Sequence, residues 1–227
     1  MCKILISTSL FYINKSSIKY NNLYRNIINS FHILSDYDVD LVIYYDDTVP
    51  TNIITDLKET KNVILVNKSV SVNRSGCFWR YEAYDDFKNY DMYFFRDIDI
   101  SLEVNDLYVI QDFLKSDRML FYIFIVHQRK PYPKQGFLMG GMFGMKNSAI
   151  KSFKKYIDIH KKEKTLGHYG SDEEFLAKTI YPLNHSLVFI EPKVKNARLT
   201  DSFFLEINLN NDHEKYIFLE NNYELLF

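Results

Sequence analysis

Cysteine, net charge and long apolar runs are all scarce in this sequence, and each shortage argues against a class of protein. Two of the 227 residues are cysteines, Cys2 and Cys77. They lie far apart in a chain long enough to build its own core, which argues against a disulfide framework or a zinc knuckle and predicts two free thiols. Lysine plus arginine number 28 and aspartate plus glutamate 29. The chain therefore lacks the net positive charge that would attract nucleic acid or an anionic membrane.

The sequence also lacks the marks of a membrane or secreted protein. No apolar run approaches the roughly 20 residues that span a bilayer. Polar Lys3, Ser7 and Thr8 interrupt the stretch where a secretory signal needs continuous apolar residues. We therefore expect a cytoplasmic protein without a transmembrane segment, in the host cytoplasm if its source is viral. With 47% hydrophobic and 25% charged residues, the composition is that of a globular domain.

Segments with strand and helix patterns alternate along the chain. Strands are expected at 3–8, 39–45, 63–66, 91–99, 120–126 and 216–219. Helices are expected at 23–34, 50–57, 74–87, 104–115 and 148–162. Apolar strands that alternate with helices predict a single Rossmann-like α/β domain, with a mostly parallel central sheet flanked by helices. Ligands of such sheets bind beyond the carboxyl ends of the strands.

The acidic triplet Asp97-Ile98-Asp99 ends the aromatic-rich run at 91–99. Carboxylates two residues apart on an extended segment point to the same side, and two like charges so placed favour a bound cation. Oxygen ligands suit Mg²⁺ or Mn²⁺, which complete their coordination with water and substrate phosphates. The alternative is that both aspartates form a solvated strand end or cap the next helix near Glu103.

The order of motifs after residue 78 resembles that of the GT-A glycosyltransferases, and the resemblance covers most of the chain. It is carried by Arg80 in Phe78-Trp79-Arg80-Tyr81, by Asp97-Ile98-Asp99, by Gly140-Gly141-Met142-Phe143-Gly144 and by Ser171-Asp172-Glu173. The likeness is to small soluble members that are found in large DNA viruses and in bacterial surface-polysaccharide clusters.

The resemblance implies a metal-dependent enzyme that moves a sugar from a nucleotide diphosphate sugar, expected to be a UDP-sugar, to a hydroxyl of a glycan or glycoprotein. The residues that it assigns to the donor are Arg80, Asp97, Asp99, Gly140 and Gly141, where the glycines form a turn beside the donor sugar and the two aspartates also hold Mn²⁺ or Mg²⁺. Asp172 or Glu173 would be the general base of an inverting enzyme. In a retaining enzyme the same carboxylate would stabilise or attack the anomeric carbon.

Basic residues and histidines supply further candidates. His127, Arg129 and Lys130 follow the strand expected at 120–126, where Arg129 would neutralise a diphosphate, although a solvated loop explains the run equally well. His185 and His213 are candidates for a third metal ligand, because some GT-A families recruit a C-terminal histidine.

Each assigned residue also has a structural interpretation. Arg80 would be a surface residue of its helix, paired with Glu82 or Asp86. The glycines would only permit a tight turn or a bulge. Asp172 would only cap the helix that follows it. Arg96, which alternates to the other face of its strand, is expected in a supporting ion pair.

The motif order predicts one domain over 1–227, divided into a nucleotide-binding half at 1–100, an acceptor half at 101–192 and a C-terminal tail at 193–227. Two other functions stay open. A phosphohydrolase of the haloacid dehalogenase type also uses Asp-x-Asp, but there the pair follows the first strand and here it follows the fourth. A noncatalytic sugar- or protein-binding module is expected if the acidic triplet and Asp172 lie far apart.

Overall fold

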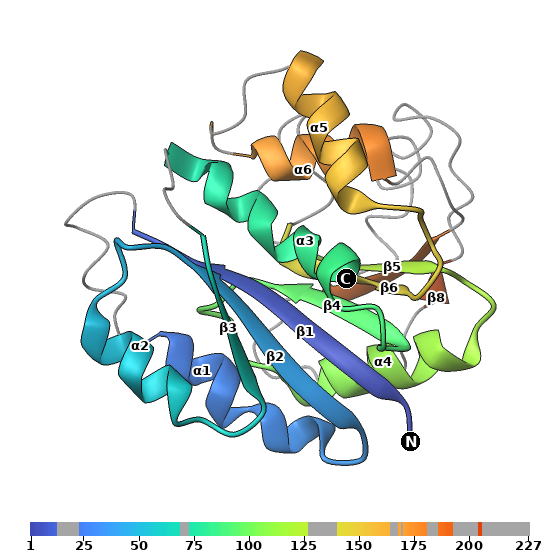
Figure 1. The fold of residues 1–227 in the computed structure, drawn as a ribbon. Coiled ribbons are helices and arrows are strands. Elements are labelled where there is room, and N and C mark those ends of the chain that lie inside the picture. Colours follow the sequence, from blue (N-terminus) through green and yellow to red (C-terminus); the bar gives the residue numbers. More distant parts are fainter. Residues whose placement is uncertain are drawn as a thin grey trace.

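A mixed sheet between two layers of helices forms the fold (Figure 1). The computed structural model describes residues 1–12, 23–68, 73–126, 140–163, 168, 170–180, 186–192 and 204–205. Within these ranges eight strands form one sheet, in the order β3-β2-β1-β4-β6-β5-β7-β8. The strands are β1 (Lys3–Leu10), β2 (Asp38–Tyr45), β3 (Val63–Asn67), β4 (Met92–Arg96), β5 (Leu120–Val126), β6 (Met142–Lys146), β7 (Ser186–Pro192) and β8 (Phe204–Leu205).

Most neighbouring strands run parallel. Strand β1 pairs in parallel with β2 and β4, β2 with β3, and β5 with β7. Strand β6 runs antiparallel to both β4 and β5, and β8 runs antiparallel to β7. The predicted α/β domain with a mostly parallel sheet is therefore confirmed. The strand expected at 216–219 lies outside the described residues.

Strand β6 corrects the glycine turn that was expected at 140–144. Gly140 and Gly141 do form a turn, but Gly144 lies within β6 and pairs with Phe94 on one side and Phe121 on the other. A Cβ at Gly144 would collide with the Phe121 ring. Glycine is required there because an aromatic ring fills the space that a side chain would need.

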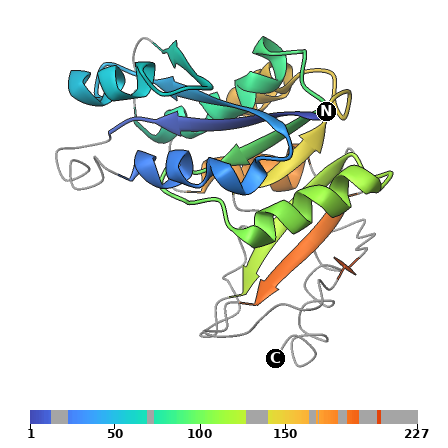
Figure 2. The ribbon, with the colours of Figure 1, turned by 90° about the horizontal axis from the view of Figure 1, so that it is seen from below.

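The helices cover both faces of the sheet. One face carries α1 (Tyr24–Asn29), α2 (Thr51–Lys58) and α4 (Val104–Lys115), and the other carries α3 (Trp79–Asp86), α5 (Phe153–Glu163) and α6 (Ser171–Phe175). Short 3-10 helices occupy Phe31–Leu34 and Asn73–Phe78, and a π-helical turn at Leu176–Ile180 follows α6. Seen from below in Figure 2, α4 crosses β5, where the rings of Phe113 and Phe121 pack with centroids 4.7 Å apart.

Two apolar cores result, one on each face of the sheet. Ile4 and Ile6 of β1 face the core under α1, α2 and α4, whereas Leu5 faces the core under α3, α5 and α6. Because alternate side chains of a strand point to opposite faces, a strand buried on both sides must be apolar almost throughout. This is the origin of the near-continuous apolar runs in the sequence.

Two predicted segments have the observed bounds, whereas the α-helices α1, α3 and α5 are shorter than the helices expected at 23–34, 74–87 and 148–162. The helix expected at 104–115 and the strand expected at 120–126 have the observed bounds of α4 and β5. Helix α5 begins at Phe153 rather than 148. Ser148 has a positive φ of 70°, which no helix contains, and the Lys155 N–H donates to Ser152 Oγ at 3.1 Å, so that Ser152 caps the helix.

Two further observations bear on the predicted class of protein. Both cysteines are free thiols, as predicted. In the part of the chain that the structure describes, no helix combines the length and apolar character that a membrane crossing requires.

Candidate active site

Arg80 is at the centre of the candidate site, in the first turn of α3. Its side chain is 5% exposed. Two serines of the buried strand β1 hold its backbone: Ser7 Oγ donates to the Arg80 carbonyl at 2.7 Å, and the Arg80 N–H donates to Ser9 Oγ at 3.1 Å. These hydroxyls fix the start of α3 against the middle of the sheet.

The Arg80 guanidinium joins two acidic segments that are far apart in sequence. Nη1 donates to Asp97 Oδ1 at 2.5 Å, and Nη2 donates to Asp172 Oδ2 at 2.9 Å. Nε donates to the Cys77 carbonyl at 3.0 Å, which fixes the plane of the group. The interpretation of Arg80 as a surface residue paired with its own helix is therefore wrong.

These ion pairs keep Arg80 charged in spite of its burial. Burial acts to lower the pKa of Arg80, but the carboxylates of Asp97 and Asp172 outweigh it and raise that pKa above its ordinary value. A buried cation with two carboxylate partners is costly to disturb, because removal of one partner leaves a buried charge without compensation.

The acidic triplet lies on a turn directly after β4. The Ile100 N–H donates to the Asp97 carbonyl at 3.2 Å, which closes a β-turn, and the Asp99 carbonyl accepts from Asn26 Nδ2 of α1 at 3.1 Å. The expectation of an extended segment is therefore wrong. The two carboxylates nevertheless influence each other: loss of water around Asp99 raises the pKa of its carboxyl, and the Asp97 charge raises it further.

The side chain of Arg96, next to Asp97 in the sequence, lies on the opposite face of the sheet. Arg96 is almost completely buried, and its Nη1 lies 3.2 Å from Asp106 Oδ1 of α4. The supporting ion pair predicted for Arg96 is confirmed. Glu103 caps α4 in a reciprocal arrangement with Asp106, so the alternative that Asp97 or Asp99 caps this helix is wrong.

Asp172 faces Arg80 from α6. The residue that precedes the helix is Gly170, whose φ of 79° is left-handed, and no side chain caps this end. The interpretation of Asp172 as only a helix cap is therefore wrong. Its Oδ2 lies 3.5 Å from the hydroxyl of Tyr81, which also donates to the Gly140 carbonyl at 3.2 Å.

Gly140 and Gly141 lie between the two acidic segments. A Cβ on Gly140 would collide with the Asp172 carboxylate and with the Tyr81 hydroxyl, and a Cβ on Gly141 would collide with Asp97. Both glycines are therefore needed for close approach of the backbone to the carboxylates.

Glu173 completes the cluster. It is half-buried, and burial together with the charges of Asp172 and Asp97 raises the pKa of its carboxyl from 4.5 to about 7. We call the set of Arg80, Asp97, Asp99, Asp172 and Glu173 the acidic site. The structure thus brings together the predicted donor and catalytic residues, with one exception.

The exception is Arg129, which lies outside the described residues together with His127, Lys130, His185 and His213. Their assignments to a diphosphate or to a metal ion stay predictions.

Sequence reasoning missed Tyr81 and the two serines that hold Arg80. Tyr81 is fully buried, and its ring stacks on Phe153 at 5.3 Å between centroids. Nothing in its sequence position marks it. Ser7 and Ser9 could have been found, because two hydroxyls at alternate positions of an apolar strand lie on the same face and predict a common polar partner.

The acidic site fits a divalent cation that is shared with a ligand. Asp97 and Asp172 contact the Arg80 guanidinium. Burial, and after it the neighbouring carboxylates, raise the pKa of Asp99 and of Glu173. Within the described ranges no three His, Cys, Asp or Glu side chains are grouped to ligate an ion. Asp97 and Asp99 would supply two carboxylates to Mg²⁺ or Mn²⁺, which take their other ligands from water and phosphate oxygens.

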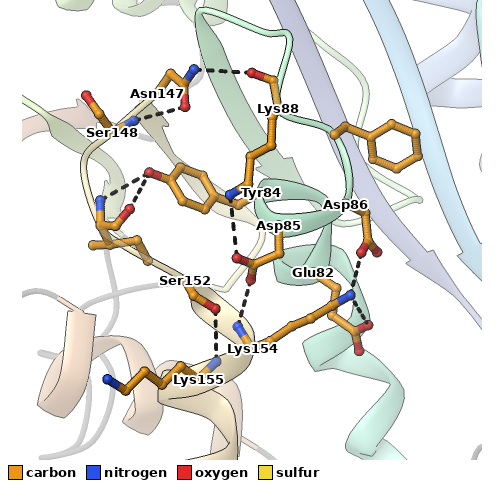
Figure 3. Close-up of polar contacts among 12 residues, drawn as sticks. Glu82, Tyr84, Asp85, Asp86, Lys88, Asn147, Ser148, Ser152, Lys154 and Lys155 are labelled. Atoms are coloured by element: carbon orange, nitrogen blue, oxygen red, sulfur yellow. Dashed lines mark hydrogen bonds and ion pairs between the residues drawn. The ribbon is translucent and has the colours of Figure 1, made fainter.

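Helix α3 is fixed at its other end to α5 (Figure 3). Lys154 Nζ contacts Asp86 and lies 3.8 Å from Glu82, and its backbone N–H donates to Asp85 at 2.8 Å. The Tyr84 hydroxyl donates to the Ile150 carbonyl at 2.7 Å. These contacts, together with Lys68 and Lys88, form what we call the α3–α5 clamp, which holds the helix that carries Arg80.

No protein-family model and no curated protein sequence matches this chain. Residues 1–349 of TarS from S. aureus, solved in complex with UDP, match with a TM-score of 0.55 and 14% identity over 84% of this chain. A candidate nucleotide-diphospho-sugar transferase from Desulfovibrio desulfuricans G20 matches over 100% of this chain and 97% of its own, with a TM-score of 0.52 and 13% identity. The chain has the GT-A fold.

The GT-A fold alone does not determine the reaction. The 4-diphosphocytidyl-2C-methyl-D-erythritol synthase of Anaerococcus prevotii DSM 20548 matches with a TM-score of 0.51 and 8% identity, over 99% of this chain and 98% of its own. This chain also spans 60% of the TarS fragment that it matches. The activity must therefore be argued from the acidic site.

Proposed function

We propose that this protein is a metal-dependent glycosyltransferase, which moves a sugar from a nucleotide diphosphate sugar to a hydroxyl of a glycan or glycoprotein. The observation that carries the proposal is the double ion pair of Arg80 with Asp97 and Asp172. It draws an Asp-x-Asp turn and an acidic helix together at the carboxyl end of β4, where α/β sheets bind ligands. The TarS structure with bound UDP supports a UDP-sugar as donor.

In this proposal the donor diphosphate lies over the Asp97–Asp99 turn. The two carboxylates would hold Mn²⁺ or Mg²⁺, which supplies Lewis-acid stabilisation of the leaving diphosphate when bound. Arg80 adds a fixed positive charge that needs no reorganisation, since its guanidinium is already oriented. The donor sugar would lie near the turn of Gly140 and Gly141, next to the Asp97 and Asp172 carboxylates that these glycines allow to approach the backbone.

The acceptor hydroxyl would approach from the side of α6, where Asp172 and Glu173 begin the helix. The nucleotide-binding half at 1–100 then supplies Arg80 and the acidic turn, and the acceptor half at 101–192 supplies the glycine turn and α6. Both halves meet at the guanidinium, so binding of donor and acceptor is coupled through one side chain.

Two alternatives lose support from the same geometry. A noncatalytic module was expected if the acidic triplet and Asp172 lay far apart, but a single guanidinium contacts both. A phosphohydrolase of the haloacid dehalogenase type places its acidic pair after the first strand, whereas here the pair follows β4.

The test is incubation with UDP-, GDP- and CDP-sugars in the presence of Mn²⁺, with products identified by mass spectrometry. The proposal predicts release of the nucleoside diphosphate, with the sugar transferred to water or to an added glycan, and loss of release with EDTA. Pyrophosphate release from CTP and a sugar phosphate would instead indicate nucleotidyl transfer, and phosphate release from simple phosphoesters would indicate a hydrolase. Either result, without diphosphate release, contradicts the proposal.

A further inference from the structure

The two carboxylates that begin α6 have different surroundings. Asp172 is buried, its Oδ2 accepts from Arg80 Nη2 at 2.9 Å, and the Tyr81 hydroxyl lies 3.5 Å from the same oxygen. Glu173 is only half-buried, and the described residues provide no hydrogen bond or ion pair to its carboxylate. The neighbouring Glu174 is engaged elsewhere, with Lys178 at 2.6 Å.

These surroundings suit the two residues to different tasks. A proton on the Asp172 oxygen would remove one of the two anionic partners of a buried guanidinium, which is costly. Asp172 also fixes the position of Arg80, because its carboxylate comes from α6 whereas that of Asp97 comes from the turn after β4. Glu173 can take up a proton without loss of any such contact, and it keeps a solvent-exposed side from which an acceptor can approach.

Resting on the proposed glycosyltransferase function, we propose that Glu173 is the general base of the acidic site and that Asp172 is a positioning residue for Arg80. The structure thereby separates two adjacent carboxylates that the sequence leaves equivalent.

The step that follows is a single displacement. The acceptor O–H gives its proton to the Glu173 carboxylate, and an oxygen lone pair forms the bond to the anomeric carbon. The bond from that carbon to the diphosphate oxygen breaks, and its electron pair stays on the diphosphate, which leaves as nucleoside diphosphate. The proton on Glu173 then passes to water. Such a reaction inverts the anomeric configuration.

The electrostatics of the cluster support this assignment. Burial and the charges of Asp172 and Asp97 raise the pKa of Glu173 to about 7, with Arg80 acting in the opposite direction. A base whose pKa lies near the working pH combines a large ionised fraction with a strong tendency to accept a proton.

The experiment compares Glu173→Gln with Asp172→Asn, and uses Glu174→Gln as the matched control on the same helix turn. Donor affinity is measured by calorimetry with UDP, GDP or CDP plus Mn²⁺, and turnover by nucleoside diphosphate release. Glu173→Gln should keep the wild-type donor affinity and lose about 10²–10⁴-fold in kcat. Asp172→Asn should weaken donor binding and raise KM, because Arg80 loses one of its two carboxylate partners. Glu174→Gln should leave both unchanged.

Other results would overturn the assignment. A wild-type kcat in Glu173→Gln would show that Glu173 is not the general base. A product whose anomeric configuration is retained, as determined by NMR, would show that the reaction is not a single displacement. Glu173 is half-exposed, so its variant tests the proposal even if Asp172→Asn fails to fold. Absence of donor binding and turnover in the wild-type protein would instead overturn the proposed function itself, before any variant is compared.

Discussion

Both ends of α3 carry many charged side chains, but among the residues that the structure describes only one end has as many basic as acidic ones. In the α3–α5 clamp the acidic residues Glu82, Asp85 and Asp86 face the lysines Lys68, Lys88 and Lys154. In the acidic site, Arg80 is the one cation that the described residues place beside the carboxylates of Asp97, Asp99, Asp172 and Glu173. Within the described ranges the clamp pairs its acidic residues with lysines, whereas the acidic site has more carboxylates than cations.

This difference separates a structural contact from a binding site. The clamp side chains are partly exposed, so water shares their charges and each pair contributes little. The Arg80 guanidinium is buried, with 5% exposure of its side chain, and beside it burial and neighbouring carboxylates raise the pKa of Asp99 and of Glu173. Carboxylates grouped around one buried guanidinium at a sheet end are the basis on which we propose a cation site here.

The largest expected effect is the loss of Arg80. Arg80→Met leaves Asp97 and Asp172 without their shared cation, so we expect a fall in the free energy of unfolding of about 3–5 kcal/mol and no nucleoside diphosphate binding. Urea unfolding followed by circular dichroism measures the first effect and calorimetry the second. Wild-type stability in Arg80→Met would show that the ion pairs do not organise the site.

A smaller effect is expected from the exposed end of the acidic triplet. Asp99→Asn removes a carboxylate that Asp97 repels, so the ligand-free protein should keep its thermal midpoint. In the wild-type protein, saturation to about 100 times Kd with Mn²⁺ and a nucleoside diphosphate should add about 2.7 kcal/mol of stability. Thermal denaturation should show that this gain is lost in Asp99→Asn. An equal gain in both proteins would place the cation elsewhere.

The pH dependence of stability should reveal Glu173. Because its pKa is raised from 4.5 to about 7 in the folded protein, the folded state binds a proton in this window that the unfolded chain does not. The stabilisation is therefore complete below pH 4.5 and is lost as pH rises through about 7. Glu173→Gln should lack this loss. The difference between the wild-type and variant free energies of unfolding, measured against pH, therefore reports Glu173 without the contribution of Asp99. Parallel pH profiles of the two proteins would contradict the prediction.

The smallest effect is expected in the clamp. Lys154→Met removes contacts with Glu82 and Asp86 that water partly screens, so the free energy of unfolding should change by no more than about 1 kcal/mol. Donor binding should be unchanged, because the Arg80 contacts are intact. A loss of donor affinity similar to that of Arg80→Met would show that the clamp and the acidic site are not separate.

The fold was largely predictable because its strands and helices have regular apolar patterns. Helix α4 and strand β5 have the predicted bounds, since each combines a strong pattern with clear ends. Strand β6 was missed because its glycine at position 144 resembles a turn residue. Position 144 needs glycine because the Phe121 ring of a neighbouring strand fills the space beside it. A contact between residues so far apart in sequence cannot be predicted from the residues around Gly144.

The residues of the acidic site were predictable, but the ion pairs between them were not. Motif order identified Arg80, Asp97 and Asp172 as members of one site. It did not predict that Arg80 is buried or that it holds both carboxylates, because those partners lie 17 and 92 residues away. The different surroundings of Asp172 and Glu173 were hidden for the same reason, since adjacent residues of a helix point in different directions.

The most direct test of the account is a crystal soaked with Mn²⁺ and UDP and recorded at the manganese absorption edge. The account predicts an anomalous peak between the Asp97 and Asp99 carboxylates, with diphosphate oxygens completing the coordination. A UDP molecule bound without manganese, or a manganese peak away from the turn after β4, would contradict it.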